Sequence, residues 1–251
     1  MRNIRLLIEY DGTMYAGWQE QKNKKSLQGT IQDAIKELTK EEIIIAASGR
    51  TDAGVHALGQ VANFFTKSTI PAERFAMAIN YHLPRDIVIL KSEEVSTEFH
   101  SRYHSKGKTY IYRIENRKIP SPFERNRSYL VKKELDFEKM KRESQKFIGT
   151  HDFIAFRSTG SSAKTTIRTI YRLDLKKEGD MIIMEIEGNG FLYNMVRIIA
   201  GTLVDIGKGR ITEGVESILK SKDRARAGNT AHSCGLFLKK VFYDLDTPGT
   251  M

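Results

Sequence analysis

The sequence has few of the residues that cross-link or interrupt a fold. Its 251 residues include one cysteine, Cys234, and five prolines. A single cysteine excludes an internal disulfide framework and a cysteine-rich zinc site. No low-complexity tract separates independent domains. No apolar run approaches the roughly 20 residues of a membrane span, and the opening residues lack an apolar stretch of signal-peptide length. We therefore expect a cytoplasmic protein that does not associate with membranes.

The chain has fewer acidic than basic residues. The chain has 41 lysines and arginines against 31 aspartates and glutamates, a formal net charge of +10. Basic residues gather in four stretches: 22–25, 102–118, 125–133 and 139–146. Such charge supplies the sequence-independent part of nucleic-acid binding, and it also suits a well-solvated surface. The charge indicates a polyanionic partner without naming a substrate.

Hydrophobic periodicity predicts an α+β protein with a mostly antiparallel sheet. Ser26 is placed to cap a helix whose apolar residues follow at helical spacing. A second long helix is expected from about residue 191. The other expected elements are strands at 4–10, 43–47, 59–66, 87–95, 108–115, 128–132 and 235–243, a hairpin at 168–188, and helices near 72–82, 136–148 and 212–220.

Two familiar motifs are incomplete. Gly107-Lys108-Thr109 resembles the end of a phosphate-binding P-loop, but Arg102 stands where that motif needs its first glycine, which argues against an NTPase. His100 and His104 lie four residues apart, yet the segment has no HExxH glutamate and no third ligand nearby. We expect no metal site.

Tyr110 and Tyr112 lie two residues apart in an expected strand and should share one face of the sheet. Aromatic residues beside lysines on a sheet face are how several RNA-binding domains stack bases. The alternative is that one tyrosine belongs to the core with its hydroxyl hydrogen bonded. The consensus of the RNA-recognition motif is matched only at Lys106-Gly107, so that module is not assigned.

The segment ASGRTDAGVHA sets Arg50 and Asp52 between Gly49 and Gly54, where the chain turns between two expected strands. Glycines permit a tight turn, and flanking strands can hold its side chains in place for catalysis. The alternative is structural: Asp52 bonds its own turn amides and Arg50 is solvated.

Several ordered motifs carry a resemblance. YDGTMYAGWQEQ, SLQGTIQDAI, GRTDAGVHA, KGKTYIYRI, HDFIAF and NGFLYNMVRIIAGTLVDIGKG occur in this order along the chain. Together they resemble the bacterial tRNA pseudouridine synthase A family over essentially the full length. The resemblance implies a pseudouridine synthase fold with two related lobes, residues 1–104 and 105–251, on a continuous, mostly antiparallel sheet. It also implies a homodimer, no cofactor, and conversion of uridine to pseudouridine in the tRNA anticodon stem-loop at positions 38 to 40.

The same resemblance assigns roles to four residues. Asp52 corresponds to the catalytic aspartate, and Arg50 to the arginine that enters the RNA helix where the target base has flipped out. Tyr110 corresponds to the tyrosine over the uracil. Arg197 corresponds to the arginine that pairs with the catalytic carboxylate. The first lobe would carry the aspartate loop, and the second the tyrosine strand and the arginine helix.

Arg197 also has a distinct place on its expected helix. The apolar residues form one stripe, while Arg197 lies beside Ala200 and Gly201 on a face of small residues, which leaves room for a guanidinium. The stripe consists of Leu192, Met195, Val196, Ile199, Leu203 and Ile206.

One segment departs from the family pattern. Where the family usually has a TAPA-like sequence, this chain has Thr230-Ala231-His232-Ser233, and loss of the proline could reshape a loop near the site. A diverged paralogue that modifies another RNA position therefore stays open as an alternative. A non-catalytic RNA-binding protein would share the charge and the tyrosines without needing the loop of Arg50 and Asp52.

Overall fold

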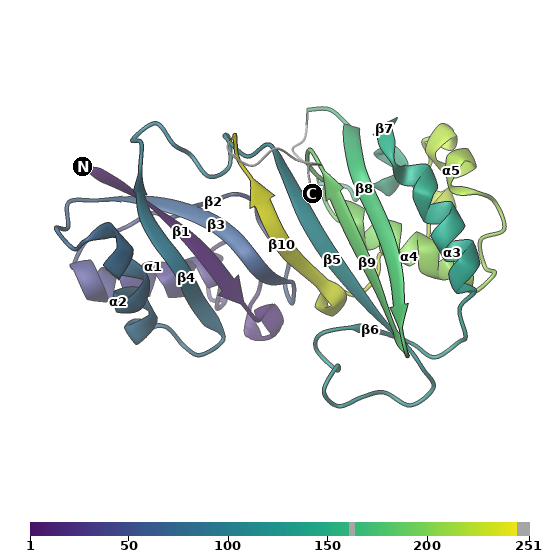
Figure 1. The fold of residues 1–251 in the computed structure, drawn as a ribbon, viewed down its shortest axis with the longest axis horizontal. Coiled ribbons are helices and arrows are strands. Elements are labelled where there is room, and N and C mark those ends of the chain that lie inside the picture. Colours follow the sequence, from purple (N-terminus) through teal and green to yellow (C-terminus); the bar gives the residue numbers. More distant parts are fainter. Residues whose placement is uncertain (161–163, 245–251) are drawn as a thin grey trace. The chain divides into compact units, whose positions relative to one another are not determined.

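The computed structural model describes residues 1–160 and 164–244. Residues 245–251, the end of the expected second lobe, lie outside the described residues. The chain divides into two compact units, one made of residues 1–105 together with the last strand from Phe237, and one made of residues 106–236. Figure 1 labels their elements. Each unit has its own buried apolar residues.

The first unit is built on antiparallel strands. Strand β1 lies between β3 and β4 and pairs antiparallel with both. Strand β10 joins β3 in parallel, with Phe237 opposite His56 and Leu238 opposite Ala57. The elements of this unit are β1 (Arg2–Tyr10), β2 (Ala46–Ala47), β3 (His56–Thr66), β4 (Ile87–Val95), β10 (Leu236–Phe242), α1 (Leu27–Thr39) and α2 (Phe75–His82).

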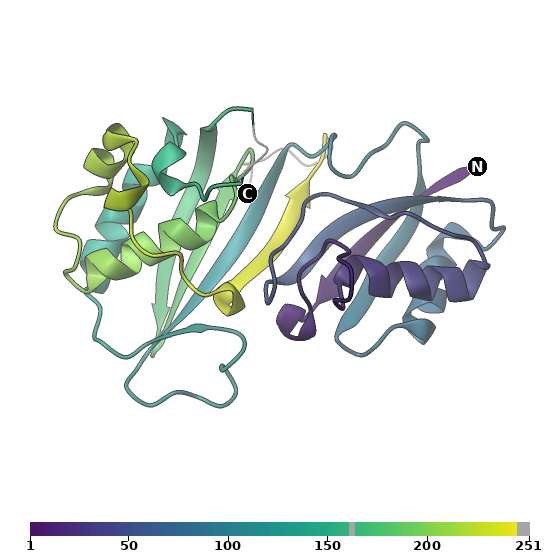
Figure 2. The ribbon, with the colours of Figure 1, turned by 180° about the vertical axis from the view of Figure 1, so that it is seen from behind.

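Alternation along β1 explains one face of this sheet, because Ile4, Leu6 and Ile8 are fully buried. The two helices contact each other, and the Phe75 ring of α2 meets the Phe64 ring of β3 edge-on. Figure 2, seen from behind, shows α1 in front of the strands of its unit. The core of the first unit therefore lies between its helices and one sheet face.

The second unit repeats this plan with different elements. Strands β5, β9, β8 and β7 pair antiparallel in that order, and the short β6 runs parallel to β5. Its elements are β5 (Gly107–Asn116), β6 (Tyr129–Val131), β7 (Gly149–Asp152), β8 (Ile167–Glu178), β9 (Met181–Gly188), α3 (Phe137–Ser144), α4 (Met195–Gly207) and α5 (Val215–Ser221). Helix α4 is buried along almost its whole length and contacts α3 and β5.

The α+β class with mostly antiparallel strands is confirmed, and so is the helix cap at Ser26, whose hydroxyl accepts from the Gly29 amide at 3.1 Å. The expected strand at 43–47 is wrong except for its last two residues. The helix expected from about 191 begins at Met195, because Asn194 adopts a left-handed conformation with φ of 61°. No helix within residues 1–160 and 164–244 is both long and apolar enough to cross a bilayer.

Candidate functional site

Main-chain hydrogen bonds fix the turn that carries Asp52. The Thr51 carbonyl accepts from the Trp18 amide at 2.9 Å, and the Asp52 carbonyl accepts from the Val55 amide at 3.1 Å. Gly54 completes the turn with φ of 75°, a conformation that glycine adopts without steric cost. Asp52 is half-buried and Arg50 is exposed. The backbone therefore holds this carboxylate at the surface of the first unit.

Two glycines let a second segment approach this turn. A Cβ at Gly12 would overlap the Val55 carbonyl, and a Cβ at Gly17 would lie 2.7 Å from the Thr51 carbonyl oxygen. Gly17 also has φ of 101°, which L side chains rarely adopt. The motifs YDGTMYAGWQEQ and GRTDAGVHA, far apart in sequence, thus meet as one structure.

Buried polar side chains brace the turn from below. The Tyr10 hydroxyl and the Thr51 hydroxyl are 2.8 Å apart. The Ser48 hydroxyl donates to the Gln60 side-chain oxygen at 2.7 Å, and the Gln60 side-chain nitrogen Nε2 donates to the Gly49 carbonyl at 2.9 Å. Burial raises the pKa of Tyr10 far above its usual value, so its hydroxyl stays protonated. These bonds fix the loop at Gly49 and at Thr51, on either side of Arg50.

Tyr110 and Tyr112 have different environments in β5. Tyr110 is half-buried, and its ring meets Phe191 edge-on at a centroid distance of 5.2 Å. Tyr112 is fully buried, and its hydroxyl donates to the His232 carbonyl at 2.6 Å. Burial raises the pKa of Tyr112 well above its ordinary value. The hypothesis of a base-stacking pair is therefore wrong for Tyr112, which is a core residue, and only Tyr110 remains a candidate.

Arg197 lies in the first turn of α4, where hydrogen bonds hold its guanidinium. Its Nε donates to the Ala231 carbonyl at 2.8 Å, and its Nη1 donates to the Asn194 side-chain oxygen at 2.8 Å. The Ala231 amide in turn donates to the Arg197 carbonyl at 3.1 Å. Because a guanidinium is planar, two bonds fix its plane.

The small residues beside Arg197 were expected to leave room for its guanidinium, but in the structure they admit another segment of the chain. A Cβ at Gly201 would overlap the Asn229 carbonyl, so glycine there admits the segment that precedes the last strand. That segment, not open space, covers the small face of α4. Its carbonyl at Ala231 then reaches Arg197.

His232, which stands in place of the family proline, keeps a proline-like backbone. Its φ of −61° and ψ of 144° lie in the range that proline adopts. The ring Nδ1 accepts from the Cys234 amide at 3.4 Å and lies 3.1 Å from the Cys234 Sγ. Burial raises the pKa of the Cys234 thiol, which donates to the Ser128 carbonyl at 3.0 Å. The extended conformation is thus kept with a different residue.

The four candidates divide between the two units, two in each. Arg50 and Asp52 share one turn of the first unit. Tyr110 and Arg197 belong to the second unit, on β5 and α4. Sequence analysis missed Asn194, which orients Arg197. An asparagine just before an apolar helix predicts an N-cap with extended backbone, whereas Asn194 is left-handed and makes no side-chain cap bond. Among the described residues, no group of three or more His, Cys, Asp or Glu side chains could hold a metal.

Comparison with known proteins identifies the class of enzyme. The family model described as tRNA pseudouridine synthase matches residues 6–104 and 144–244. The chain belongs to this family, and it is accordingly an isomerase with a pseudouridine synthase fold. The resemblance drawn from the motifs is confirmed.

Individual relatives match over almost the whole chain. The tRNA pseudouridine synthase A of Acetivibrio thermocellus is 55% identical over 97% of this chain and 100% of the relative. The tRNA pseudouridine synthase A 2 of Clostridium tetani is 54% identical over 97% of this chain and 99% of the relative. Among solved structures, a Cbf5-Nop10-Gar1 complex aligns with a TM-score of 0.40 and 13% identity, over 94% of this chain and 59% of that chain.

Proposed function

We propose that the protein converts uridine to pseudouridine in the anticodon arm of tRNA, at positions 38 to 40, with Asp52 as the nucleophile. The observation that carries the proposal is the turn itself: a half-buried carboxylate held by main-chain bonds on both sides and braced by buried polar side chains. The relatives named tRNA pseudouridine synthase A support tRNA as the substrate.

The reaction needs a nucleophile and no electron carrier. The bond between uracil N1 and ribose C1′ breaks, a bond between uracil C5 and C1′ forms, the C5 proton is lost, and N1 gains a proton. Substrate and product have the same atoms and oxidation state. A carboxylate can attack either C1′ of the ribose or C6 of the base, so Asp52 suits both routes. The proposal therefore includes no cofactor.

The other three residues take supporting roles in this proposal. Arg50 is exposed beside Asp52 and would fill the gap that a flipped base leaves, offsetting an unstacking cost of about a few kcal/mol. Tyr110 would stack on the uracil and assist removal of the C5 proton. Arg197 would pair with the Asp52 carboxylate and keep it ionised when the substrate excludes water.

The protein would act in the cytoplasm as a homodimer, with the anticodon stem-loop as its ligand. The net charge of +10 supports a polyanionic ligand. A diverged paralogue that modifies another RNA position is the alternative. His232 in place of proline favours it only weakly, because the proline-like backbone at this position is retained.

Mapping pseudouridine in tRNA tests the proposal directly. Unmodified tRNA is folded in magnesium, incubated with the protein, and treated with a reagent that forms adducts on pseudouridine. New adducts at positions 38 to 40 would support the proposed specificity. Adducts only outside the anticodon arm would favour the paralogue, and no adducts would favour a non-catalytic RNA-binding protein.

Asp52→Asn tests the nucleophile. Release of tritium from tRNA labelled at uracil C5 should fall at least about 10³-fold, because asparagine cannot form the covalent intermediate. Binding of tRNA should change by no more than a few-fold. Asp33→Asn removes the same charge from an exposed position on α1 and should stay active. Substantial tritium release by folded Asp52→Asn would place the nucleophile elsewhere.

A further inference from the structure

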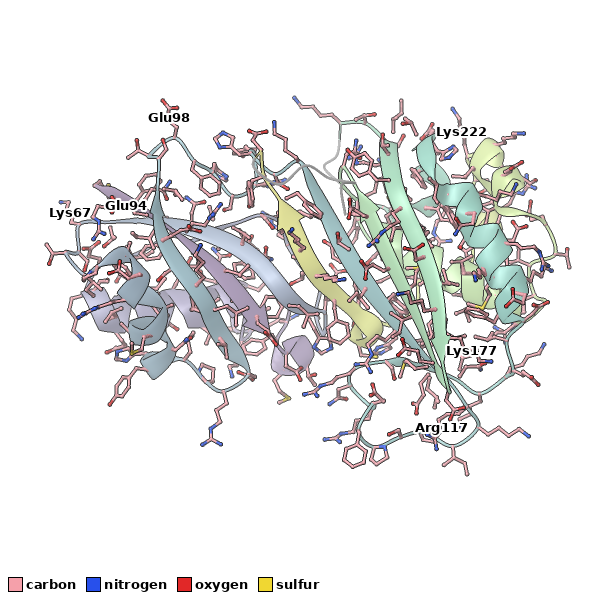
Figure 3. All side chains as sticks on the ribbon, in the orientation of Figure 1. Lys67, Glu94, Glu98, Arg117, Lys177 and Lys222 are labelled. Atoms are coloured by element: carbon pink, nitrogen blue, oxygen red, sulfur yellow. The ribbon has the colours of Figure 1, made fainter. Side chains whose placement is uncertain are left out.

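A pocket in the second unit lies outside the four candidate residues. It has a volume of about 390 Å³ and is lined by Ile154, Arg157, Ser158, Thr159, Lys222 and Arg224. Its walls come from the short 3-10 helix Ile154–Phe156 and the residues just after it, and from the segment that follows α5. Figure 3 labels Lys222, which projects near the end of α5. The volume is in the range of small-ligand sites.

The charge of this pocket is one-sided. Three of its six lining residues are cations and none is an acid. Lys222 pairs with Asp152 at 3.1 Å. Of the residues that the structure describes, none forms an ion pair with Arg157 or Arg224. The pocket therefore has two guanidinium charges that an anion could neutralise.

Arg224 is fixed in place before any ligand arrives. Its Nη1 donates to the Gly228 carbonyl at 3.0 Å and to the Ala227 carbonyl at 3.3 Å, and its Nη2 lies 3.3 Å from the Thr230 hydroxyl. Arg224 is half-buried, so its charge is partly removed from water, and this burial lowers the pKa of its guanidinium. A charge that is ordered and partly desolvated attracts an anion more strongly than a solvated one.

The nature of the lining favours a phosphate. Guanidinium groups match the oxygens of a phosphate with paired hydrogen bonds, and the Ser158 and Thr159 hydroxyls add donors. Among the described lining residues there is no aromatic ring on which a base could stack. The pocket thus suits the backbone of a nucleic acid rather than its bases.

Two hydrogen bonds connect the wall of this pocket to Arg197. The Asn194 side-chain nitrogen Nδ2 donates to the Ser158 hydroxyl at 3.0 Å, and the Asn194 side-chain oxygen Oδ1 accepts from Arg197 Nη1 at 2.8 Å. The Ser158 amide also donates to the Tyr193 carbonyl at 3.1 Å, which ties the wall to the start of α4. A group bound in the pocket would therefore be held in a fixed position relative to Arg197, through Ser158 and Asn194.

We propose that this pocket is a phosphate subsite that binds one backbone phosphate of the tRNA substrate and so sets the position of the RNA relative to Arg197. The proposal rests on the proposed function only in taking tRNA as the ligand. Arg157 is the residue to test, because Arg224 also supports the segment beside α4.

Arg157→Gln should weaken tRNA binding about three- to tenfold near physiological salt, as expected for loss of one charge-assisted contact. In filter binding over a range of salt concentrations, the slope of log affinity against log salt should become less steep by about 0.7 to 0.9. Arg142→Gln is the matched control, because Arg142 is exposed on α3 and does not line the pocket. Equal slopes for the two variants would overturn the proposal.

Two further measurements test whether the charge of Arg157 is responsible and whether the pocket binds a free anion instead of RNA. Arg157→Lys keeps the charge and should retain the salt slope of the parent, with thermal melts checking that every variant is folded. Titration of the parent with inorganic phosphate alone, by calorimetry, tests for a free anion. Binding of inorganic phosphate to the parent with no slope change in Arg157→Gln would identify a site for small anions and overturn the RNA proposal.

Failure of the proposed function would look different. If the parent makes no pseudouridine but Arg157→Gln still loses slope against tRNA, the subsite stands and the catalytic assignment falls. If the parent makes pseudouridine and Arg157→Gln keeps the parental slope, the subsite is refuted and the catalytic assignment stands.

Discussion

The turn that carries Asp52 and the helix that carries Arg197 are held in different ways. Asp52 depends on main-chain bonds from Trp18 and Val55 and on the absence of a side chain at Gly12. Arg197 lies on a regular helix and is oriented through its own guanidinium. The first arrangement tolerates no change in the backbone around it. In the second, a change of side chain can alter the orientation while the fold persists.

Gly12→Ala should have the largest effect on stability. Its Cβ would overlap the Val55 carbonyl, and backbone cannot move aside as a flexible side chain can. We expect the free energy of unfolding to fall by at least about 2–3 kcal/mol, measured by urea denaturation. Gly190→Ala is the control, because its Cβ would come no closer than 3.6 Å to the Arg168 side chain. A Gly12→Ala protein as stable as the parent would show that the turn can shift, which would break the comparison.

Arg197→Lys should reduce turnover and leave the fold intact. Lysine keeps the charge but cannot donate to Ala231 and Asn194 from one rigid plane. We expect kcat to fall roughly 10- to 100-fold with little change in KM, measured by single-turnover and steady-state tritium release. Arg142→Lys, on the exposed face of α3, serves as the control. Unchanged kcat would mean that charge alone matters at position 197.

Tyr112→Phe should have a smaller effect than Arg197→Lys. It should lower the stability of the fold and leave turnover unchanged. It removes the hydroxyl that donates to the His232 carbonyl at 2.6 Å and leaves that carbonyl without this donor. The expected loss in unfolding free energy is about 1 kcal/mol, read from a thermal melt. Tyr103→Phe is the control and should show no loss, because Tyr103 is 74% exposed. Abolished turnover in a stable Tyr112→Phe protein would return this tyrosine to the list of catalytic candidates.

His232→Pro should have the smallest effect, and in the opposite direction. The backbone at His232 already has φ of −61°, so proline fits and restricts the unfolded chain. A gain of about 0.4 to 1 kcal/mol is expected, reduced by whatever the long contact of the ring with the Cys234 amide contributes. Urea denaturation of the variant and the parent measures whether the free energy of unfolding rises or falls. A loss greater than about 1 kcal/mol would mean that the histidine itself supports this segment.

Local patterns predicted much of the fold, because they depend on residues close in sequence. Alternation identified β1, and the hydroxyl of Ser26 identified the start of α1. The strand expected at 43–47 was mostly wrong, since an apolar run does not show whether a pairing partner exists for it. The segment that forms β7 carried no alternation and was missed.

The candidate site was less open to prediction from local patterns. The role of Gly12 depends on its contact with Val55, which is distant in sequence. The need for glycine at position 12 could therefore not be explained before that contact was known. The two tyrosines of β5 have the same spacing signal. That signal does not show that Tyr112 is fully buried, with its hydroxyl bonded to the His232 carbonyl, while Tyr110 is half-buried. The roles of Asp52 and Arg197 rested on resemblance and remain predictions.

The parallel pairing of β10 with β3 links the turn that carries Asp52 to the order in which the chain is synthesised. His56 and Ala57, just after the turn, find their partners Phe237 and Leu238 only when the second unit has been translated. At about 5–20 residues per second, the roughly 130 residues between Ser105 and Phe237 take roughly 7 to 26 s. During that time this edge of β3 in the nascent chain lacks its final partner, and strand edges are sites of mispairing. Chains stalled on the ribosome before Phe237 should therefore be cut by protease near His56 faster than chains stalled after Phe242 on a C-terminal extension long enough to carry the last strand out of the exit tunnel. Equal cleavage would show that the turn is stable without its last strand.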